Sequence, residues 1–241
     1  MNFSIIIPAK NEYNKLNITL SSLAIQTYRD FECIIMDNLS TVETQSLVSQ
    51  YQKDIPNLVL YSSQDKGIYD AMNKGVSYAM GEYILFLGAG DTLHSPDILA
   101  QVNDALTHKI PDVLYGDIIY LPNQYISQPQ ALSNHYFKSG KMICHQSIFA
   151  RKETLNSYPF HLEYSFGADR DWLIHTFLNQ NTFVHIPVAI ADYDTSGYTS
   201  LAVNRKAVWM ESGKILRKYY GSLMLSITFI KYYLVIKWQK K

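Results

Sequence analysis

Short runs of consecutive apolar residues alternate, in the first part of the chain, with stretches in which apolar residues recur every three or four positions. Four such runs occur, at residues 3–7, 31–36, 58–61 and 83–87. Their branched and aromatic side chains are typical of buried strands. The stretches between them, such as the one marked by Leu16, Leu20 and Leu23, have the spacing of one helix face. Because parallel strands need crossover connections, this alternation predicts a mostly parallel α/β sheet with helices on both faces.

The second half of the chain continues the alternation with less regularity. We predict a helix over residues 95–107, a strand over 113–121 that is interrupted at Gly116 and Asp117, a helix entered through 166–173 and a strand over 183–189. Residues 122–139 are polar and weakly patterned, so we predict a long loop there. Loops of that length are often functional.

Polar side chains follow two of the predicted strands. Asp37 follows the second strand, and Asp91 follows the fourth through the small residues Gly88, Ala89 and Gly90. In open α/β sheets, ligands bind beyond the carboxyl ends of the strands. We therefore expect a crevice of nucleotide size at this edge, and Asp91 is the first candidate for its reactive centre.

Composition excludes several classes of protein. The chain of 241 residues is 47% hydrophobic, enough for one large domain or two small ones. Lys+Arg and Asp+Glu both number 21, so the basic character of nucleic-acid-binding proteins is absent. Cys33 and Cys144 lie in apolar runs, which favours free thiols in a reducing compartment. The first residues do not have the pattern of a signal peptide, and no apolar run reaches the roughly 18 residues of a membrane span.

The common nucleotide-binding loops are missing. A dinucleotide-binding G-x-G-x-x-G loop would follow the first strand, where this chain reads PAKNEY. The Gly-Lys-Ser/Thr of a Walker loop is also absent from the sequence. We therefore expect neither a nicotinamide or flavin enzyme nor a P-loop nucleotidase.

Several motifs occur in a recognisable order. They are IIIPAKNE, SLAIQTYRDFECIIMDNLST, DKGIYDAMNKG, GEYILFLGAGDTL, CHQSIFARKE and GADRDWL. Together they resemble the family-two glycosyltransferases of GT-A fold, nearest to the small bacterial enzymes that build capsule, colanic-acid and O-antigen polysaccharides. The resemblance implies a Rossmann-like domain over residues 1–200, with a nucleotide-binding half (1–91) and an acceptor-binding half (92–200).

The resemblance also implies an activity. Enzymes of this kind transfer a hexosyl or N-acetylhexosaminyl group, with inversion, from a nucleotide-sugar donor to a glycan or lipid-linked saccharide. We expect a UDP-sugar as the donor. The positions that match donor-binding residues of the family are Pro8, Ala9, Asn11, Glu12, Asp37, Asn38, Asp65, Lys66, Gly67, Asn73, Gly90 and Asp91. Because the chain reads DNLST where the family usually has D-D-G-S, either Asp37 or Asn38 is the residue that faces the base.

The metal motif of the family is depleted here. Its D-A-D-D pattern corresponds to Gly88, Ala89, Gly90 and Asp91, so only the last acid remains. The resemblance implies that Asp91 coordinates Mn²⁺ or Mg²⁺ together with the donor diphosphate, since hard cations take oxygen ligands. A single carboxylate predicts weak metal affinity without nucleotide, and a metal-independent enzyme is the alternative.

The resemblance places the catalytic base at Asp169. Such a base takes the proton from the attacking acceptor hydroxyl, and a single displacement needs no second carboxylate as nucleophile. His145, Gln146 and Asp171 match positions on the acceptor side. The alternatives are a helix cap for Asp169, a helix-dipole role for Asp171 and a buried core role for His145. Residues 191–200 resemble the family segment that closes over the diphosphate.

The end of the chain, residues 201–241, forms a separate unit in this reading. A basic helix is predicted over residues 204–220, and residues 223–236 are hydrophobic with Lys231 inside. Aromatic and basic residues in so short a segment suit a membrane interface. We expect a cytoplasmic enzyme held peripherally at the inner face of the cell membrane. Packing of this segment on its own domain or on a second subunit, as in a homodimer, is the alternative.

Two other functions stay open at this point. A nucleotidyltransferase that makes nucleotide sugars has the same type of α/β sheet. It would require a glycine-rich basic loop after the first strand, where this chain has PAKNE. A catalytically silent nucleotide-binding protein would fit the depleted acidic motif.

Overall fold

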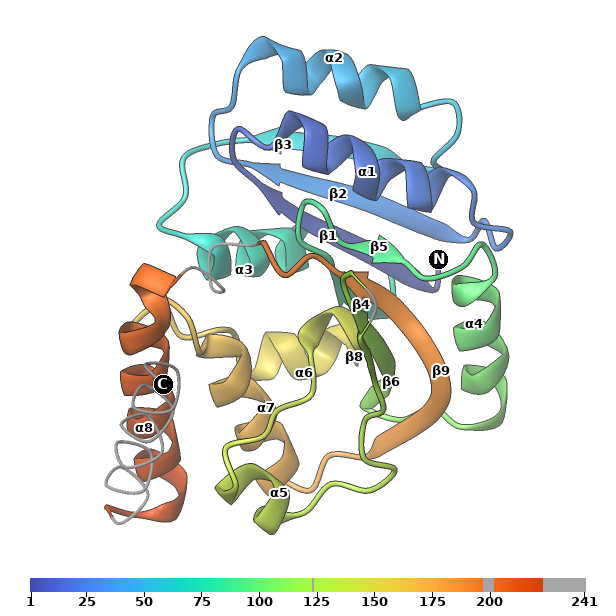
Figure 1. Ribbon diagram of the computed structural model, residues 1–241. Helices are drawn as coiled ribbons and strands as arrows, with labels where there is room; N and C mark the ends of the chain where they lie inside the picture. Colours follow the sequence, from blue (N-terminus) through green and yellow to red (C-terminus); the bar gives the residue numbers. More distant parts are fainter. Residues whose placement is uncertain (123, 197–201, 223–241) are drawn as a thin grey trace.

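The computed structural model describes residues 1–122, 124–196 and 202–222, and it shows a sheet with helices on both faces (Figure 1). Its strands are β1 (Phe3–Ala9), β2 (Phe31–Asp37), β3 (Leu58–Ser62), β4 (Tyr83–Phe86), β5 (Thr92–Leu93), β6 (Val113–Tyr120), β7 (Gln124–Ile126), β8 (Ile148–Arg151) and β9 (Phe183–Tyr193). Its helices are α1 (Tyr13–Ala24), α2 (Val42–Tyr51), α3 (Ile68–Tyr78), α4 (Ile98–His108), α5 (Asn134–Lys138), α6 (Lys152–Ser157), α7 (Ala168–Leu178) and α8 (Arg205–Tyr220), with 3₁₀ turns η1 (His145–Ser147) and η3 (Ala202–Asn204).

The strand order across the sheet is β3-β2-β1-β4-β8-β6-β9-β5, with β7 beside β6. The first four strands of this order are parallel to one another, as the alternation of strands and helices predicts. Strand β8 then runs antiparallel to both β4 and β6, while β9 is parallel to β6. The α/β class is confirmed, and the sheet becomes mixed where the second half of the chain joins it.

Alternate residues of the central strands enter two different hydrophobic layers. Ile6 and Ile34 belong to the layer formed with α3, α6 and α7. Ile5, Ile7 and Cys33 belong to the opposite layer, formed with α1, α2 and α4. These side chains are fully buried or nearly so, and each isoleucine contributes on the order of 1.5–3 kcal/mol to folding. Burial on both faces explains why these strands have continuous apolar sequences.

Three predicted boundaries differ from the structure. Residues 122–139 are not one long loop, because they contain β7, which pairs with β6, and α5, which Ser133 caps by accepting a hydrogen bond from the Tyr136 N–H. Strand β9 continues past the predicted end at residue 189, since its last residues pair with β5. Residues 116–117 do not interrupt β6 but shift its register against β9. At Gly116 an added Cβ would lie 2.5 Å from the Val188 carbonyl oxygen, so a side chain there would prevent the close pairing.

The predicted basic helix at the end of the chain is present as α8, which packs against α7. The hydrophobic segment 223–236 lies outside the described residues. Within the part of the chain that the structure describes, no helix has the length and apolar character needed to cross a membrane.

Candidate active site

A cleft of about 1170 Å³ lies beyond the carboxyl ends of β1, β2 and β4. Both halves of the chain line it, and both Asp91 and Asp169 are among the lining residues. The predicted site residues that line the cleft are Pro8, Ala9, Glu12, Asn38, Asp65, Lys66, Gly67, Asp91, His145, Gln146 and Asp169. The structure therefore brings together most of the residues that the sequence motifs indicate, from segments more than 150 positions apart.

One wall of the cleft, where the sequence motifs predict donor binding, is built from the ends of β2 and β3 and is called the donor wall below. Asn38 Nδ2 donates a hydrogen bond of 2.8 Å to Asp65 Oδ1, which also accepts from the Gly67 N–H at 2.9 Å. Asp37, in contrast, is buried and accepts hydrogen bonds from the Ser40 N–H and the Ser62 hydroxyl. Of the two alternatives left open by the sequence, Asn38 is the one that lines the cleft.

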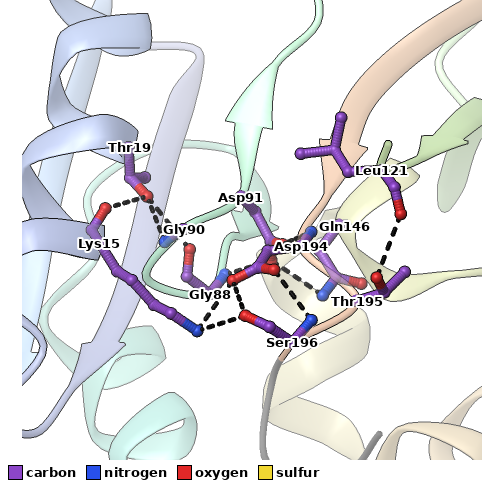
Figure 2. Close-up of polar contacts among 10 residues, drawn as sticks. All are labelled: Lys15, Thr19, Gly88, Gly90, Asp91, Leu121, Gln146, Asp194, Thr195 and Ser196. Atoms are coloured by element: carbon purple, nitrogen blue, oxygen red, sulfur yellow. Dashed lines mark hydrogen bonds and ion pairs between the residues drawn. The ribbon is translucent and has the colours of Figure 1, made fainter. Parts of the chain in front are cut away.

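Asp91 stands at the centre of a hydrogen-bond network (Figure 2). Its Oδ2 accepts from the Gly88 N–H at 2.9 Å and from Gln146 Nε2 at 3.0 Å, and its Oδ1 accepts from the Asp194 N–H at 2.8 Å. The carboxylate is buried, with 3% of the residue exposed. Burial raises the pKa of Asp91 above its ordinary value, although these three hydrogen bonds oppose the shift.

Residues 194–196 cross from β9 to α1 beside this carboxylate (Figure 2). Lys15 Nζ contacts Asp194 Oδ2 at 2.8 Å and donates to the Ser196 hydroxyl at 2.9 Å. Burial alone would raise the pKa of Asp194, but the bonds from Lys15 and Ser196 lower it. The hydrogen bond to Asp194 in turn raises the pKa of Lys15. The 194–196 segment is thus fixed to the first helix, and its backbone holds Asp91 in place.

Gly90 makes this close approach possible. Its φ is +103°, a conformation that favours glycine, and an added Cβ would lie 2.8 Å from Asp194 Oδ2. Its N–H donates to Thr19 Oγ1 on α1 at 2.9 Å. Gly90 is not among the residues that line the cleft. Its role is to leave the space that the Asp194 carboxylate occupies.

Asp169 lies at the start of α7 on the opposite wall. Its Oδ1 accepts from the Tyr69 hydroxyl at 3.0 Å and from the Arg170 N–H at 2.8 Å, while its Oδ2 lies 3.0 Å from His145 Nδ1. Burial by itself would raise the pKa of Asp169, but the contacts with His145, Tyr69 and Arg170 outweigh it and lower the pKa. The contact with the N–H of its own helix agrees with the capping alternative, yet two of the three partners come from elsewhere in the chain.

Two consecutive residues connect the carboxylates of the two walls. His145 contacts Asp169, and Gln146 donates to Asp91. Both residues belong to the 3₁₀ turn η1, directly before β8. His145 and Gln146 therefore hold Asp169 and Asp91 close to one short backbone segment, and both carboxylates line the same cleft.

Four other predicted site residues do not line the cleft. Both polar atoms of the Asn73 side chain bond the backbone of Phe160. Asp171 is fully buried and bonds Lys218 at 2.8 Å, which attaches α8 to α7. Asn11 is exposed, with its N–H on the Ser40 hydroxyl, and Asp37 is buried as described. The ligand-binding prediction for Asn73 and the acceptor-binding prediction for Asp171 are corrected, because structural contacts occupy these side chains.

The residues around Asp91 bear on the expected metal. Among residues 1–122, 124–196 and 202–222, no group of three or more His, Cys, Asp or Glu side chains is arranged to hold a cation. A carboxylate offers about four lone-pair positions, of which Asp91 uses three for N–H donors. The residues therefore fit a cation site in which Asp91 supplies one ligand and the oxygens of a bound molecule supply the others.

The family profile described as Glycosyl transferase family 2 matches residues 4–180. The chain belongs to glycosyltransferase family 2. Family membership confirms the predicted enzyme class and removes the nucleotidyltransferase alternative. It also explains the order of the strand-end motifs around the cleft.

Two relatives of this family 2 chain are named as biosynthesis glycosyltransferases. It is 36% identical over 200 residues to a "PGL/p-HBAD biosynthesis glycosyltransferase" of Mycobacterium bovis (strain BCG / Pasteur 1173P2), covering 81% of this chain and 77% of the relative. It is 24% identical to the "Amylovoran biosynthesis glycosyltransferase AmsB" of Erwinia amylovora, over 89% of this chain and 78% of that protein.

Solved structures confirm the GT-A fold of this glycosyltransferase. The S. aureus TarS 1-349 complex with UDP-GlcNAc superimposes with a TM-score of 0.73 at 19% identity, covering 95% of this chain and 72% of that chain. A mannosyltransferase of Pyrobaculum calidifontis, in complex with GDP-Man and Mn²⁺, gives a TM-score of 0.68 at 16% identity, covering 95% of this chain and 73% of that chain. The chain spans about 40% of the longer TarS structure.

Proposed function

We propose that this enzyme transfers a sugar, with inversion, from a UDP-sugar to a hydroxyl of a glycan or lipid-linked saccharide in bacterial surface polysaccharide biosynthesis. One observation carries the proposal. Consecutive residues, His145 and Gln146, contact the carboxylates of the acceptor wall and the donor wall, and all of them line one cleft. A leaving group and an attacking hydroxyl can therefore meet between Asp91 and Asp169.

The volume of the cleft supports binding of two substrates. Small-molecule sites commonly measure about 300–1,000 Å³. The 1170 Å³ found here leaves room for an acceptor beside a nucleotide sugar. On the donor wall, the Asn38 amide and the Asp65 carboxylate offer donors and acceptors for a base or a ribose. A UDP-sugar is favoured because the TarS structure of the same fold holds UDP-GlcNAc.

The diphosphate of the donor is proposed to lie between Asp91 and Lys15. When Mn²⁺ or Mg²⁺ is bound by Asp91 and the phosphate oxygens, it supplies positive charge for the leaving group. The mannosyltransferase complex that contains Mn²⁺ supports this assignment. Lys15, which is 2.8 Å from Asp194, brings a second positive charge to the same wall. Gly88 and Gln146 orient the Asp91 carboxylate, because both donate to its Oδ2.

On the acceptor wall, the Asp169–His145 pair is proposed to supply the base. It takes the proton of the acceptor hydroxyl while the hydroxyl oxygen forms a bond to the anomeric carbon. The bond from that carbon to the diphosphate oxygen breaks on the opposite face, and its electron pair leaves with the nucleotide. One displacement of this kind inverts the anomeric configuration.

The proposal is tested with the purified protein and a panel of nucleotide sugars, with and without Mn²⁺. We expect one UDP-sugar to raise the melting temperature most and to be slowly hydrolysed or transferred. No hydrolysis or transfer of any nucleotide sugar, in the presence of stabilisation by UDP, would favour the silent nucleotide-binding protein. The proposed membrane contact is tested separately by deleting residues 222–241. The deletion should reduce sedimentation with membranes, and unchanged sedimentation would contradict the contact.

The proposed homodimer concerns the same part of the chain. We propose that the protein is a homodimer and that the end of the chain, from α8 onward, takes part in the contact between subunits. Analytical ultracentrifugation of the full chain and of the deletion variant tests this directly. A monomer at micromolar concentration in both samples would contradict it.

A further inference from the structure

Helix α8 reaches the cleft, although it lies outside residues 4–180, the part of the chain that the family profile matches. Two of its residues, Val208 and Ser212, line the cleft together with the segment 165–166 that precedes α7. The helix lies against α7 (Figure 1). The wall that carries Asp169 is therefore completed by an element that follows the family-matched region.

Glu211 of α8 binds the backbone just ahead of α7 with both of its carboxylate oxygens. Its Oε1 accepts a hydrogen bond from the Ser165 N–H at 2.9 Å, and its Oε2 accepts one from the Phe166 N–H at 2.8 Å. Hydrogen bonds to a charged acceptor are stronger than those between neutral groups. Two such bonds to consecutive N–H groups fix the direction of the chain as it enters α7.

Helix α7 begins without a capping side chain of its own. Its N-cap residue is Gly167, and Asp169 lies in its first turn. An added Cβ at Gly167 would lie 2.7 Å from Cδ1 of Ile215, so α8 packs directly on the backbone there. Beyond Asp169, Lys218 of α8 bonds Asp171 at 2.8 Å. Contacts from α8 thus hold the first turn of α7 on both sides of Asp169 in the sequence.

We propose that Glu211 is a positioning residue for the reaction, because it fixes the place of Asp169 on the acceptor wall through the backbone of Ser165 and Phe166. The inference rests on the proposed function and deepens it, since the Asp169–His145 pair keeps the role of base. A base must come within about 2.6–3.2 Å of the oxygen whose proton it takes. A displacement of about 1 Å in a reacting group can cost on the order of 100-fold in rate. Loosening the backbone just ahead of Asp169 should therefore slow the reaction and leave the donor wall intact.

The charge of Glu211 also acts on the hydroxyl that bonds Asp169. Burial raises the pKa of Tyr69 well above its ordinary value, and the negative charges of Asp169 and Glu211 add to the shift. Tyr69 therefore stays protonated and donates its 3.0 Å hydrogen bond to Asp169 Oδ1. Because burial is the main cause, Tyr69 keeps its proton when the Glu211 charge is removed. A variant at Glu211 thus tests its two backbone bonds.

The test compares E211Q and E211A with a matched change elsewhere on α8. Glutamine has nearly the size of glutamate but one acceptor oxygen, so one of the two N–H groups loses its partner. Alanine removes both acceptors. The control is Y219F, because the Tyr219 hydroxyl donates to the Asp171 carbonyl oxygen at 3.2 Å and Tyr219 is not among the residues that line the cleft. It weakens the contact between α8 and α7 without touching the 165–166 backbone.

Three measurements are made on each full-length protein. Melting temperature and stabilisation by UDP with Mn²⁺ show that the variant folds and binds the donor nucleotide. Turnover is the release of UDP from the UDP-sugar that the wild type uses fastest, which counts hydrolysis as well as transfer, and it gives kcat and the donor KM separately. Amide hydrogen exchange over residues 162–173 reports whether the start of α7 has loosened.

We expect kcat to fall about 3- to 10-fold in E211Q and more than 10-fold in E211A, with a donor KM within about twofold of wild type. Exchange over residues 162–173 should be faster in both, and Y219F should keep its kcat within about twofold. If E211A does not fold, E211Q decides. Wild-type kcat in E211Q, an equal loss of kcat in Y219F, or an equal rise in donor KM would overturn the proposal. A wild-type enzyme that releases UDP from no nucleotide sugar would instead refute the proposed function.

Discussion

Replacing Gly90 with alanine should damage both the fold and the donor site. An alanine at this position, where φ is +103°, must adopt a backbone conformation that costs roughly 1–2 kcal/mol. Its Cβ would also lie 2.8 Å from Asp194 Oδ2, so Asp194 has to move. The movement weakens the 2.8 Å hydrogen bond from the Asp194 N–H to Asp91, and a bond to a charged group contributes about 1.5–3 kcal/mol.

Gly140 provides the matched control. Its φ is +83°, but an added Cβ would meet nothing within 4 Å. The substitution G140A therefore carries the backbone cost alone, and G90A should be about 1.5–3 kcal/mol less stable than G140A. In a chain of this size that difference corresponds to a melting temperature roughly 3–12 °C lower.

The assay is thermal unfolding of both variants, followed by UDP binding in the presence of Mn²⁺. We expect weaker UDP binding in G90A only, because Asp91 loses a contact that orients it. In a D194A background, G90A should cost no more than G140A, since the obstructing carboxylate is gone. Equal destabilisation by G90A and G140A, with equal UDP affinity, would refute the role given to Gly90 and Asp194.

Three further outcomes follow from the same structure. K15M should lower UDP affinity about three- to tenfold, as measured by isothermal titration. It should cost under about 1 kcal/mol of stability in urea unfolding, because the Lys15–Asp194 pair is partly exposed. D171A should cost about 1.5–3 kcal/mol in urea unfolding, since it removes the buried acceptor of Lys218 and of the Tyr158 hydroxyl, and a loss under about 0.5 kcal/mol would contradict the role of Asp171 in attaching α8. The pKa of Asp194 is lowered from about 3.8 in the folded protein, so its contribution to stability is present above about pH 4 and is lost as the pH falls through the folded value. The difference in unfolding free energy between wild type and D194N should therefore shrink between about pH 5 and pH 2. A constant difference would contradict the stabilising role of the Asp194 carboxylate.

The central strands were predictable because each is buried on both faces. Such burial forces a continuous apolar sequence, as in residues 31–36, and the positions that follow these strands carry the cleft residues Asn38 and Asp91. The short elements β7 and α5 were missed, because three to five residues are too few to show a period.

The errors at the site have a common physical origin. Asn73 and Asp171 look like ligands because they are polar residues on helices near the motifs, but each satisfies a buried partner that is distant in sequence, Phe160 and Lys218 respectively. Lys15, in contrast, was not predicted as a site residue although it lines the cleft. In the sequence it is one lysine on the polar side of α1, and only the fold brings it to Asp194.

The central claim is that the two walls of the cleft divide the work, with Asp91 serving the donor and the Asp169–His145 pair serving the acceptor. The direct measurement is equilibrium UDP binding with Mn²⁺, together with single-turnover sugar transfer, in wild type, D91N and D169N. We predict weakened UDP binding in D91N, and wild-type UDP binding with transfer slowed at least 100-fold in D169N. Normal transfer by D169N, or UDP binding lost in D169N and kept in D91N, would contradict the account.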